Sequence, residues 1–174
     1  MRPADRAPGV VVREAREDEL DAAGAVVAEA YIADYGPRHR AYLDQIRDAR
    51  ERARTCPVLV AVDGDGRILG SVTYVPDHQN PWAETEAEGE AGFRMLGVDP
   101  DARGRGIGER LAAACVERAV ADGRRGVAIT STPAMHAAHR LYARMGFVRD
   151  PTRDLDPIPG VHLYTFTLAL ADRR

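Results

Sequence analysis

The second half of the chain alternates between short apolar runs and helix-forming segments, and this alternation limits the fold more than any other feature of the sequence. The pattern predicts strand, helix, strand, helix and strand at residues 91–98, 106–122, 127–130, 134–145 and 162–170. Strands that alternate with helices are typical of α/β proteins. We therefore expect an α/β (α+β) fold with a mixed central sheet.

The first half adds further strands and helices. Residues 17–31 carry apolar side chains at helical spacing, and residues 39–54 form a more charged helical segment that we expect at the surface. Strands are expected at residues 10–13, 58–62 and 68–75. Asp63-Gly64-Asp65-Gly66 joins the last two as a hairpin, because its glycines supply the positive φ that a tight turn needs. Residues 76–89 contain too many helix and strand breakers for an element, so we expect a loop.

Length and charge narrow the classes of function. A chain of 174 residues, 45% of them hydrophobic, suffices for one well-buried core, so we expect a single domain over residues 10–171 after a disordered start at residues 1–9. A net charge of −3 argues against nucleic acid as a partner. The first twelve residues hold no apolar run long enough for a signal peptide or a membrane span, so we expect a cytoplasmic protein without a membrane partner.

Two counts of reactive side chains exclude further chemistry. All 24 residues counted as lysine or arginine are arginine, which excludes a Schiff-base lysine, a pyridoxal phosphate enzyme and the lysine of a Walker A loop. Cys56 and Cys115 stand alone in separate segments, so neither a disulfide framework nor a zinc site is indicated, and we expect no metal.

The most informative motif is the glycine-rich turn from Val98 to Gly108, between a predicted strand and a predicted helix. Glycines let backbone amides approach a ligand closely, and a helix N-terminus offers unpaired N–H donors to phosphate groups. The glycine spacing fails the Rossmann pattern, because Glu109 and Leu111 stand where a third glycine is required. A phosphate-binding turn of another kind is indicated, and a glycine-rich connector without a ligand is the alternative.

Two motifs in fixed order resemble the GNAT superfamily of N-acetyltransferases. Arg103-x-x-Gly106-x-Gly108 is similar to the family's Arg/Gln-x-x-Gly-x-Gly/Ala pyrophosphate signature. About thirty-five residues later, the segment from Ala138 to Phe147 resembles the family's Ala-x-x-Leu-Tyr-x-x-x-Gly-Phe motif. The similarity covers roughly residues 10–170.

This resemblance implies a fold and a cofactor site. The fold is a central sheet of about six to seven strands flanked by about four helices, with a V-shaped splay between the fourth and fifth strands, here residues 91–98 and 127–130. The pantetheine arm of acetyl-CoA would pair with the backbone of Leu96, Gly97 and Val98. Its diphosphate would bind the amides of Arg103, Gly104, Arg105, Gly106, Ile107 and Gly108.

The resemblance also assigns catalytic roles. Tyr142 would protonate the departing thiolate, and a core tyrosine packed in the helical stripe is the alternative. Glu90 would accept the proton of the amine, with Glu88 and His78 as rivals and a solvated loop residue as the alternative for all three. A β-bulge is expected in the strand at residues 91–98, where it would disturb the alternation of faces. Met135 stands where many relatives carry an asparagine that contacts the cofactor, so that contact is not expected here.

The implied activity is transfer of an acetyl group from acetyl-CoA to a primary amine, by direct attack in a ternary complex. We expect a small-molecule acceptor, and a protein N-terminus, a longer acyl donor such as succinyl-CoA and a non-catalytic acyl-CoA sensor are the alternatives. The loop before residue 91 carries Asp77, Glu84, Glu86, Glu88 and Glu90 beside Trp82, a charge pattern that would attract a cationic amine. A homodimer is left open.

Overall fold

The computed structural model describes residues 8–170, and these fall into two compact units. Unit 1 runs to Tyr74 and includes residues 95–114, and unit 2 comprises residues 75–94 and the chain from Cys115 onward. Strands β3 (Ile68–Val75) and β4 (Glu90–Val98) and helix α5 (Ile107–Ala121) contribute residues to both. One domain over residues 10–171 stays a prediction. Residues 1–7 of the expected disordered start, and residue 171, lie outside the described residues.

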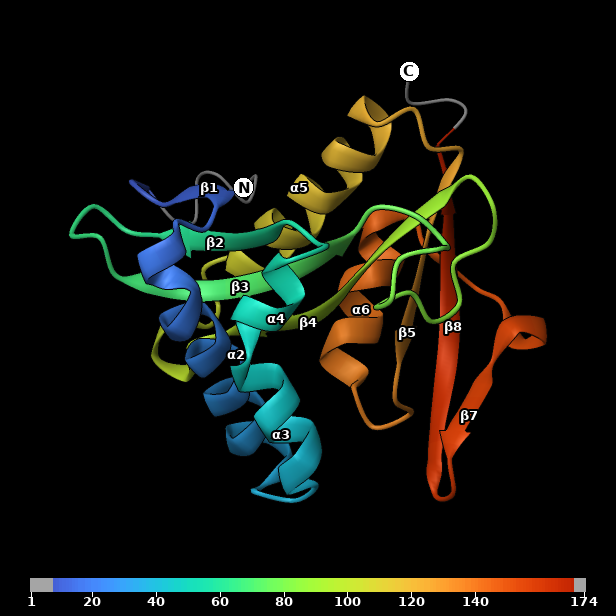
Figure 1. The fold of residues 1–174 in the computed structure, drawn as a ribbon, viewed down its shortest axis with the longest axis horizontal. Helices are drawn as coiled ribbons and strands as arrows, with labels where there is room; N and C mark the ends of the chain where they lie inside the picture. Colours follow the sequence, from blue (N-terminus) through green and yellow to red (C-terminus); the bar gives the residue numbers. More distant parts are fainter. Residues whose placement is uncertain (1–7, 171–174) are drawn as a thin grey trace. The chain divides into compact units, whose positions relative to one another are not determined.

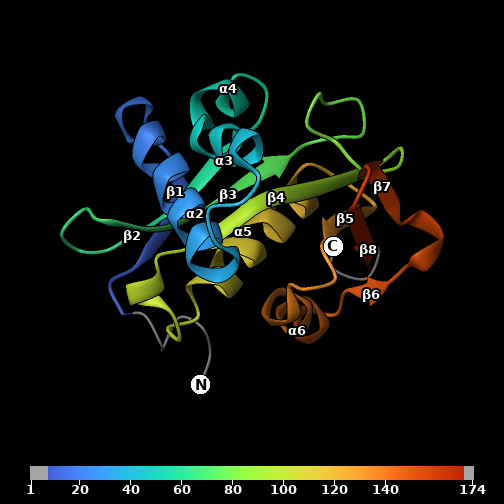
Figure 2. The ribbon, with the colours of Figure 1, turned by 90° about the horizontal axis from the view of Figure 1, so that it is seen from below.

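Unit 1 is a layered arrangement of antiparallel strands and helices. Its remaining elements are β1 (Val11–Glu14), the 3-10 helix η1 (Glu17–Glu19), α2 (Leu20–Tyr35), α3 (Arg40–Arg47), α4 (Ala49–Ala53), β2 (Val58–Val62) and the 3-10 helix η2 (Pro100–Ala102). The strand order is β1-β2-β3-β4. Figure 2 shows α3 and α4 on one side of β2 and β3, and α5 on the other. The expected hairpin of residues 58–62 and 68–75 is confirmed, with Val58 opposite Thr73.

Unit 2 contains the other half of the strands. Its elements are β5 (Gly126–Ser131), α6 (His136–Met145), β6 (Val148–Arg149), the 3-10 helix η3 (Pro151–Arg153), β7 (Leu155–Ile158) and β8 (Val161–Ala169). The strand order is β4-β5-β8-β6. β7 pairs with β8 and forms a hairpin with it, which Figure 1 shows. β4 and β5 are parallel, whereas β5 and β8 are antiparallel. The expected mixed α/β fold is confirmed.

The structure has eight strands and five α-helices among residues 8–170, a few more than the sequence predicts. Two of the additional elements are β6, which has two residues, and β7, which contains Pro157. A two-residue strand has no periodicity to detect, and a proline within a run argues against a strand. Segments like these become strands because β8 pairs with them.

The single surface helix expected at residues 39–54 is wrong, because the chain breaks it at Asp48. Asp48 ends α3 and caps α4 by accepting a hydrogen bond from the Glu51 amide at 3.1 Å. Arg52 is 1% exposed, and it donates to the carbonyls of Gln45 (2.6 Å) and Ile46 (2.9 Å), which α3 leaves unpaired at its end. The buried guanidinium therefore stabilises a helix break that a charged sequence does not reveal.

Two glycines bring the elements of unit 1 close together. A Cβ atom on Gly97 would lie 2.9 Å from Cα of Val27, so α2 packs directly on the backbone of β4. A Cβ atom on Gly70 would lie 3.0 Å from a methyl group of Leu111 and 2.9 Å from the Gly97 carbonyl. Side chains at either position would force these elements apart, so the glycines fix where α5 begins relative to the end of β4.

Candidate functional site

The glycine-rich turn of unit 1 has the backbone conformation that a phosphate-binding loop needs. Gly104 and Gly106 have φ of 78° and 75°, a region that other residues enter at a cost of about 1–2 kcal/mol. Helix α5 begins directly afterwards at Ile107. The N–H groups of its first turn have no partner within the helix, and the helix dipole adds partial positive charge there. The turn can therefore bind a diphosphate through backbone amides.

The residues before the turn attach it to β3. Asp99 follows β4, its amide donates to the Leu69 carbonyl at 2.8 Å, and its side chain caps η2 by accepting from the Asp101 amide at 2.9 Å. Arg67 forms an ion pair with the same Asp99 carboxylate. The residues that directly follow β4, Asp99 and Pro100, thus also anchor the turn.

Arg103 has a partner within unit 1. Its guanidinium forms a bidentate pair with Asp34 at the end of α2, with N–O distances of 2.5 Å and 3.1 Å. Both side chains are 41% exposed, so the pair is accessible to solvent. The expected role of Arg103 at the diphosphate therefore rests on its backbone amide, unless the side chain leaves Asp34.

Strand β4 is irregular where the resemblance predicts a bulge. Met95 has a φ of 53°, the left-handed conformation that is uncommon for a residue other than glycine. A left-handed residue inside a strand interrupts the pleat, as a β-bulge does. Leu96, Gly97 and Val98 follow this interruption, and Leu96 and Val98 are partly exposed. Their backbone is the segment expected to pair with the pantetheine arm.

In unit 2 the parallel ladder of β4 with β5 is short. It joins Glu90 to Gly126 and Ala91 to Val127. β5 continues to Ser131, and its antiparallel ladder with β8 extends over that whole length. The short ladder agrees with a splay between the fourth and fifth strands.

Tyr142 lies on α6 in a cluster of aromatic rings. Its ring centroid is 5.9 Å from Phe93, 5.7 Å from Phe147 and 5.9 Å from Phe166. The residue is 6% exposed. This packing fixes the direction of the phenol, a requirement for a positioned acid and equally a property of a core tyrosine.

Glu90, the expected base, lies in a buried ion pair. Arg153 donates to both of its carboxylate oxygens, at 3.2 Å and 2.6 Å, and the Ala87 amide donates at 2.8 Å. Arg125 adds a second guanidinium at 3.8 Å. Burial alone would raise the pKa of Glu90, but the hydrogen bonds from Arg153 and Ala87 outweigh it and lower that pKa. A carboxylate held in this way is a weak proton acceptor.

The two rivals of Glu90 lie in the segment before β4, which has turns and bends but no helix or strand. His78 and Glu88 are exposed there, and the Glu88 carbonyl accepts from the Arg125 side chain at 2.8 Å. The structure therefore brings neither His78 nor Glu88 into a buried polar contact.

Met135 precedes α6 and makes no side-chain capping bond.

Two other glutamates of this segment lie against the sheet of unit 2. Glu84 accepts a hydrogen bond from Thr130 on β5 at 3.2 Å and lies 3.6 Å from the Arg94 guanidinium, which also covers the ring of Trp82. Glu86 accepts from the backbone amides of Glu84 and Thr85. The sequence places both only in an acidic loop, because glutamates at every second position give no sign of which one is buried.

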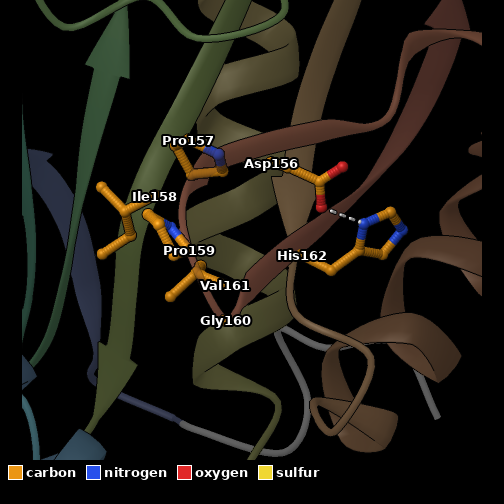
Figure 3. Close-up of a pocket in the computed structure, with 7 residues that line it drawn as sticks. All are labelled: Asp156, Pro157, Ile158, Pro159, Gly160, Val161 and His162. Carbon is orange, nitrogen blue, oxygen red and sulfur yellow. Dashed lines mark hydrogen bonds and ion pairs between the residues drawn. The ribbon is translucent and has the colours of Figure 1, made fainter.

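A hollow beside the β7–β8 hairpin has no connection with these residues. It is lined by residues 156–162, and Figure 3 shows His162 turned toward Asp156, 2.7 Å away. The hydrogen bond with Asp156 raises the pKa of His162. None of the predicted site residues lines this hollow, so we assign it no part in the reaction.

Two features typical of other kinds of site are not found among residues 8–170. No helix there has the length and apolar character of a membrane span. Over the same residues, no three His, Cys, Asp or Glu side chains gather as metal ligands would.

Comparisons with known proteins agree with the fold and the motifs. The sequence model of the Acetyltransferase (GNAT) family matches residues 24–147. A mycothiol acetyltransferase from Actinosynnema mirum is 34% identical over 91 residues, which are 52% of this chain and 28% of that protein. An L-methionine sulfoximine/L-methionine sulfone acetyltransferase from Pseudomonas paraeruginosa is 33% identical over 100 residues, 58% of this chain and 55% of that one. The chain thus spans between a quarter and about half of the length of these relatives.

Solved structures share the architecture. A GNAT-family acetyltransferase from Staphylococcus aureus Mu50 superposes with a TM-score of 0.73 at 12% identity, over 92% of this chain and 99% of that chain. The yncA protein of Salmonella typhimurium, solved with its cofactor acetyl-CoA, gives 0.63 at 16% identity, over 94% and 95%. At such identities the likeness concerns the fold alone.

Proposed function

Because the chain belongs to the Acetyltransferase (GNAT) family and is an acetyl-transferring enzyme, we propose that it moves the acetyl group of acetyl-CoA to the primary amine of a small molecule. The observation that carries this proposal is the turn at residues 103–108. Gly104 and Gly106 adopt positive φ there, immediately before the N-terminus of α5. Such a turn suits the diphosphate of coenzyme A.

The reaction is a direct attack within a ternary complex. The amine nitrogen forms a bond to the thioester carbonyl carbon, a backbone N–H of β4 near Leu96 stabilises the oxyanion, and the carbon–sulfur bond then breaks. One such donor typically contributes about 3 kcal/mol to lowering the barrier. Tyr142 donates a proton to the departing thiolate, and a glutamate in the segment that leads into β4 accepts the proton that the amine loses.

Support for a small acceptor comes from the relatives. Mycothiol and methionine sulfoximine, which appear in the names of the two curated relatives, are both small molecules. The chain covers only part of either protein, so neither acceptor is transferred directly. Attraction of cationic amines by the acidic segment also stays a prediction. Arg94 and Arg153 lie beside Glu84 and Glu90, so their positive charges oppose the negative charge of these two glutamates.

Two measurements test the proposal. Calorimetry with coenzyme A measures binding, and release of the free thiol from acetyl-CoA measures transfer to a panel of amines. The panel contains L-methionine sulfoximine, L-methionine sulfone, a neutral amine, a polyamine and a peptide with a free N-terminus. We expect release that depends on a small amine. Binding without acceptor-dependent release would favour the acyl-CoA sensor, and absence of binding would remove the basis of the proposal.

Varying ionic strength in the same assay tests the acidic segment. A cationic acceptor drawn by negative charge should be used more slowly as salt rises, because exposed charges are screened. Rates that do not change with salt would sink the electrostatic hypothesis without affecting acetyl transfer itself.

A further inference from the structure

Glu86 places a carboxylate oxygen on the backbone of β4. A Cβ atom on Gly92 would lie 2.0 Å from Oε1 of Glu86, so this oxygen occupies the space that a side chain at position 92 would fill. The other oxygen, Oε2, is held by the amides of Glu84 at 2.6 Å and Thr85 at 3.0 Å. One oxygen is thus anchored, while the other lies against the strand one residue beyond the β4–β5 ladder.

We propose that Glu86 is the general base that accepts the proton of the acceptor amine. This inference rests on the proposed acetyl transfer, and it replaces Glu90 in the role that the sequence predicts. It names a catalytic residue from the segment before β4 rather than from the strand itself.

Two other carboxylates near Glu86 in the sequence, Glu84 and Glu90, are already paired with cations. Glu84 lies 3.6 Å from Arg94, and Glu90 lies 2.6 Å from Arg153. Over residues 8–170, no guanidinium comes within ion-pair distance of Glu86. A carboxylate that is paired with a cation binds a proton less tightly. Of Glu84, Glu86 and Glu90, Glu86 is the one without a guanidinium at ion-pair distance among residues 8–170.

The surroundings of Glu86 also favour proton binding. Burial raises its pKa, and the negative charge of Glu84 adds to this, whereas hydrogen bonds from the backbone amides of Glu86, Glu84 and Thr85 counteract part of it. The charged groups around it are Glu84 in its own segment and Arg153 of η3, which is hydrogen-bonded to Glu90 and interacts with Glu86 only electrostatically. A pKa above the ordinary glutamate value brings a base closer to neutral pH, where general-base catalysis is most efficient.

Glu86 and Tyr142 lie on opposite faces of β4. Successive residues of a strand point to opposite faces, and Phe93 contacts Tyr142 whereas Gly92 lies under Glu86. β8 shows the same division, because Phe166 packs on Tyr142 and Thr165 contacts Thr85, the neighbour of Glu86. A base acts on nitrogen and an acid acts on sulfur, so groups on opposite faces can serve the two atoms without competing for one proton.

The proton balance of this step is complete. Nitrogen bonds to the acetyl carbon and gives its proton to Glu86, directly or through a water molecule. The carbon–sulfur bond breaks, and the thiolate takes the proton of Tyr142. The products are an amide and free coenzyme A, and solvent returns the proton from the carboxyl to the phenolate.

The test compares four single variants by their pH dependence of kcat/KM with acetyl-CoA and the best amine of the panel. For Glu86→Gln we expect a loss of about 100-fold or more near neutral pH, because general bases contribute about 10²–10⁴-fold. The acid limb of the pH profile should disappear, and the loss should shrink as pH approaches the pKa of the amine. Glu90→Gln should keep the acid limb, and Glu117→Gln, at an exposed position of α5, should match the wild type.

Glu86→Asp is the fourth variant, and it guards against misfolding of the first. It retains a titrating carboxylate but withdraws it from Gly92, so we expect a smaller loss with the acid limb preserved. Glu86→Gln should bind coenzyme A with the affinity of the wild type, as measured by calorimetry. A residue with a merely structural role would not combine unchanged affinity for coenzyme A with a changed pH profile.

The outcomes separate this inference from the proposed function. If the wild type transfers no acetyl group to any amine, the proposed function fails. If the wild type is active and Glu86→Gln keeps its rate and acid limb, only the assignment of Glu86 is overturned. Loss of the limb in Glu90→Gln instead would return the role to Glu90.

Discussion

The turn at residues 103–108 and the acidic segment before β4 are candidate sites that depend on different parts of the chain. The turn relies on backbone: glycines at positive φ and the first amides of a helix. The acidic segment relies on side chains, whose properties depend on arginines far along the chain, such as Arg153, 63 residues after Glu90. A site made by the backbone can therefore be predicted from the local spacing of residues, whereas a site made by side chains depends on partners that are distant in the sequence.

The largest effect that would sharpen this contrast is expected at Tyr142. Tyr142→Phe removes the phenolic proton but keeps a ring among Phe93, Phe147 and Phe166. We expect kcat to fall by about 10²–10⁴-fold, the range of general acid–base catalysis. Affinity for coenzyme A should not change, and steady-state thiol release together with calorimetry measures both. An unchanged kcat would mean that Tyr142 is a core tyrosine.

A smaller effect, on stability rather than rate, is expected at Glu90. Glu90→Gln leaves Arg153 facing a neutral amide in a buried position, so we expect the free energy of unfolding to fall by about 1–3 kcal/mol near neutral pH. The lowered pKa of Glu90 means that the wild type has this stabilisation above the ordinary carboxyl pKa. The wild type loses this stabilisation as pH falls through the lower pKa that Glu90 has in the folded state.

Denaturant unfolding of the wild type and Glu90→Gln over an acid pH series measures this effect. The difference between the two proteins should narrow as pH falls, and Glu117→Gln should follow the wild type throughout. A difference that stays constant with pH would contradict the ion pair as the source of the stability.

A backbone effect of intermediate size is expected at Gly106. Gly106→Ala puts a side chain at a φ of 75°, which costs about 1–2 kcal/mol, so we expect the KM for acetyl-CoA to rise by about 5–30-fold. S-acetylpantetheine lacks the diphosphate, and its KM should not change. Equal effects on both donors would show that the turn does not bind the diphosphate, and the turn would then not be a backbone binding site.

Much of the fold was predictable from sequence, because hairpin glycines and alternating apolar runs act locally. The two strands at residues 58–62 and 68–75 lie where the pattern places them. The break at Asp48 was not predictable, since it depends on the burial of Arg52 beneath the end of α3. Local patterns specify elements, but a buried cation and its distant partners decide where an element stops.

The same division applies to the candidate site. The motif around Gly106 predicted a turn between strand and helix, which the structure contains. Which glutamate carries the tight ion pair could not be predicted, because Glu86 and Glu90 are alike in sequence, whereas in the structure Arg153 and Arg125 both lie against Glu90. The roles of Tyr142, Glu86 and Glu90 in catalysis stay predictions.

The smallest effect is expected at Arg103, where backbone and side chain belong to the same residue. Its guanidinium pairs with Asp34 at a solvent-exposed position, and exposed pairs contribute less than about 1 kcal/mol. If only the Arg103 amide binds the diphosphate, Arg103→Gln and Asp34→Asn should each change the Kd for coenzyme A by less than about 5-fold. If the side chain exchanges Asp34 for a phosphate, Arg103→Gln should weaken binding while Asp34→Asn strengthens it, most clearly at low salt. Calorimetry on this matched pair therefore decides whether the turn is a backbone site alone.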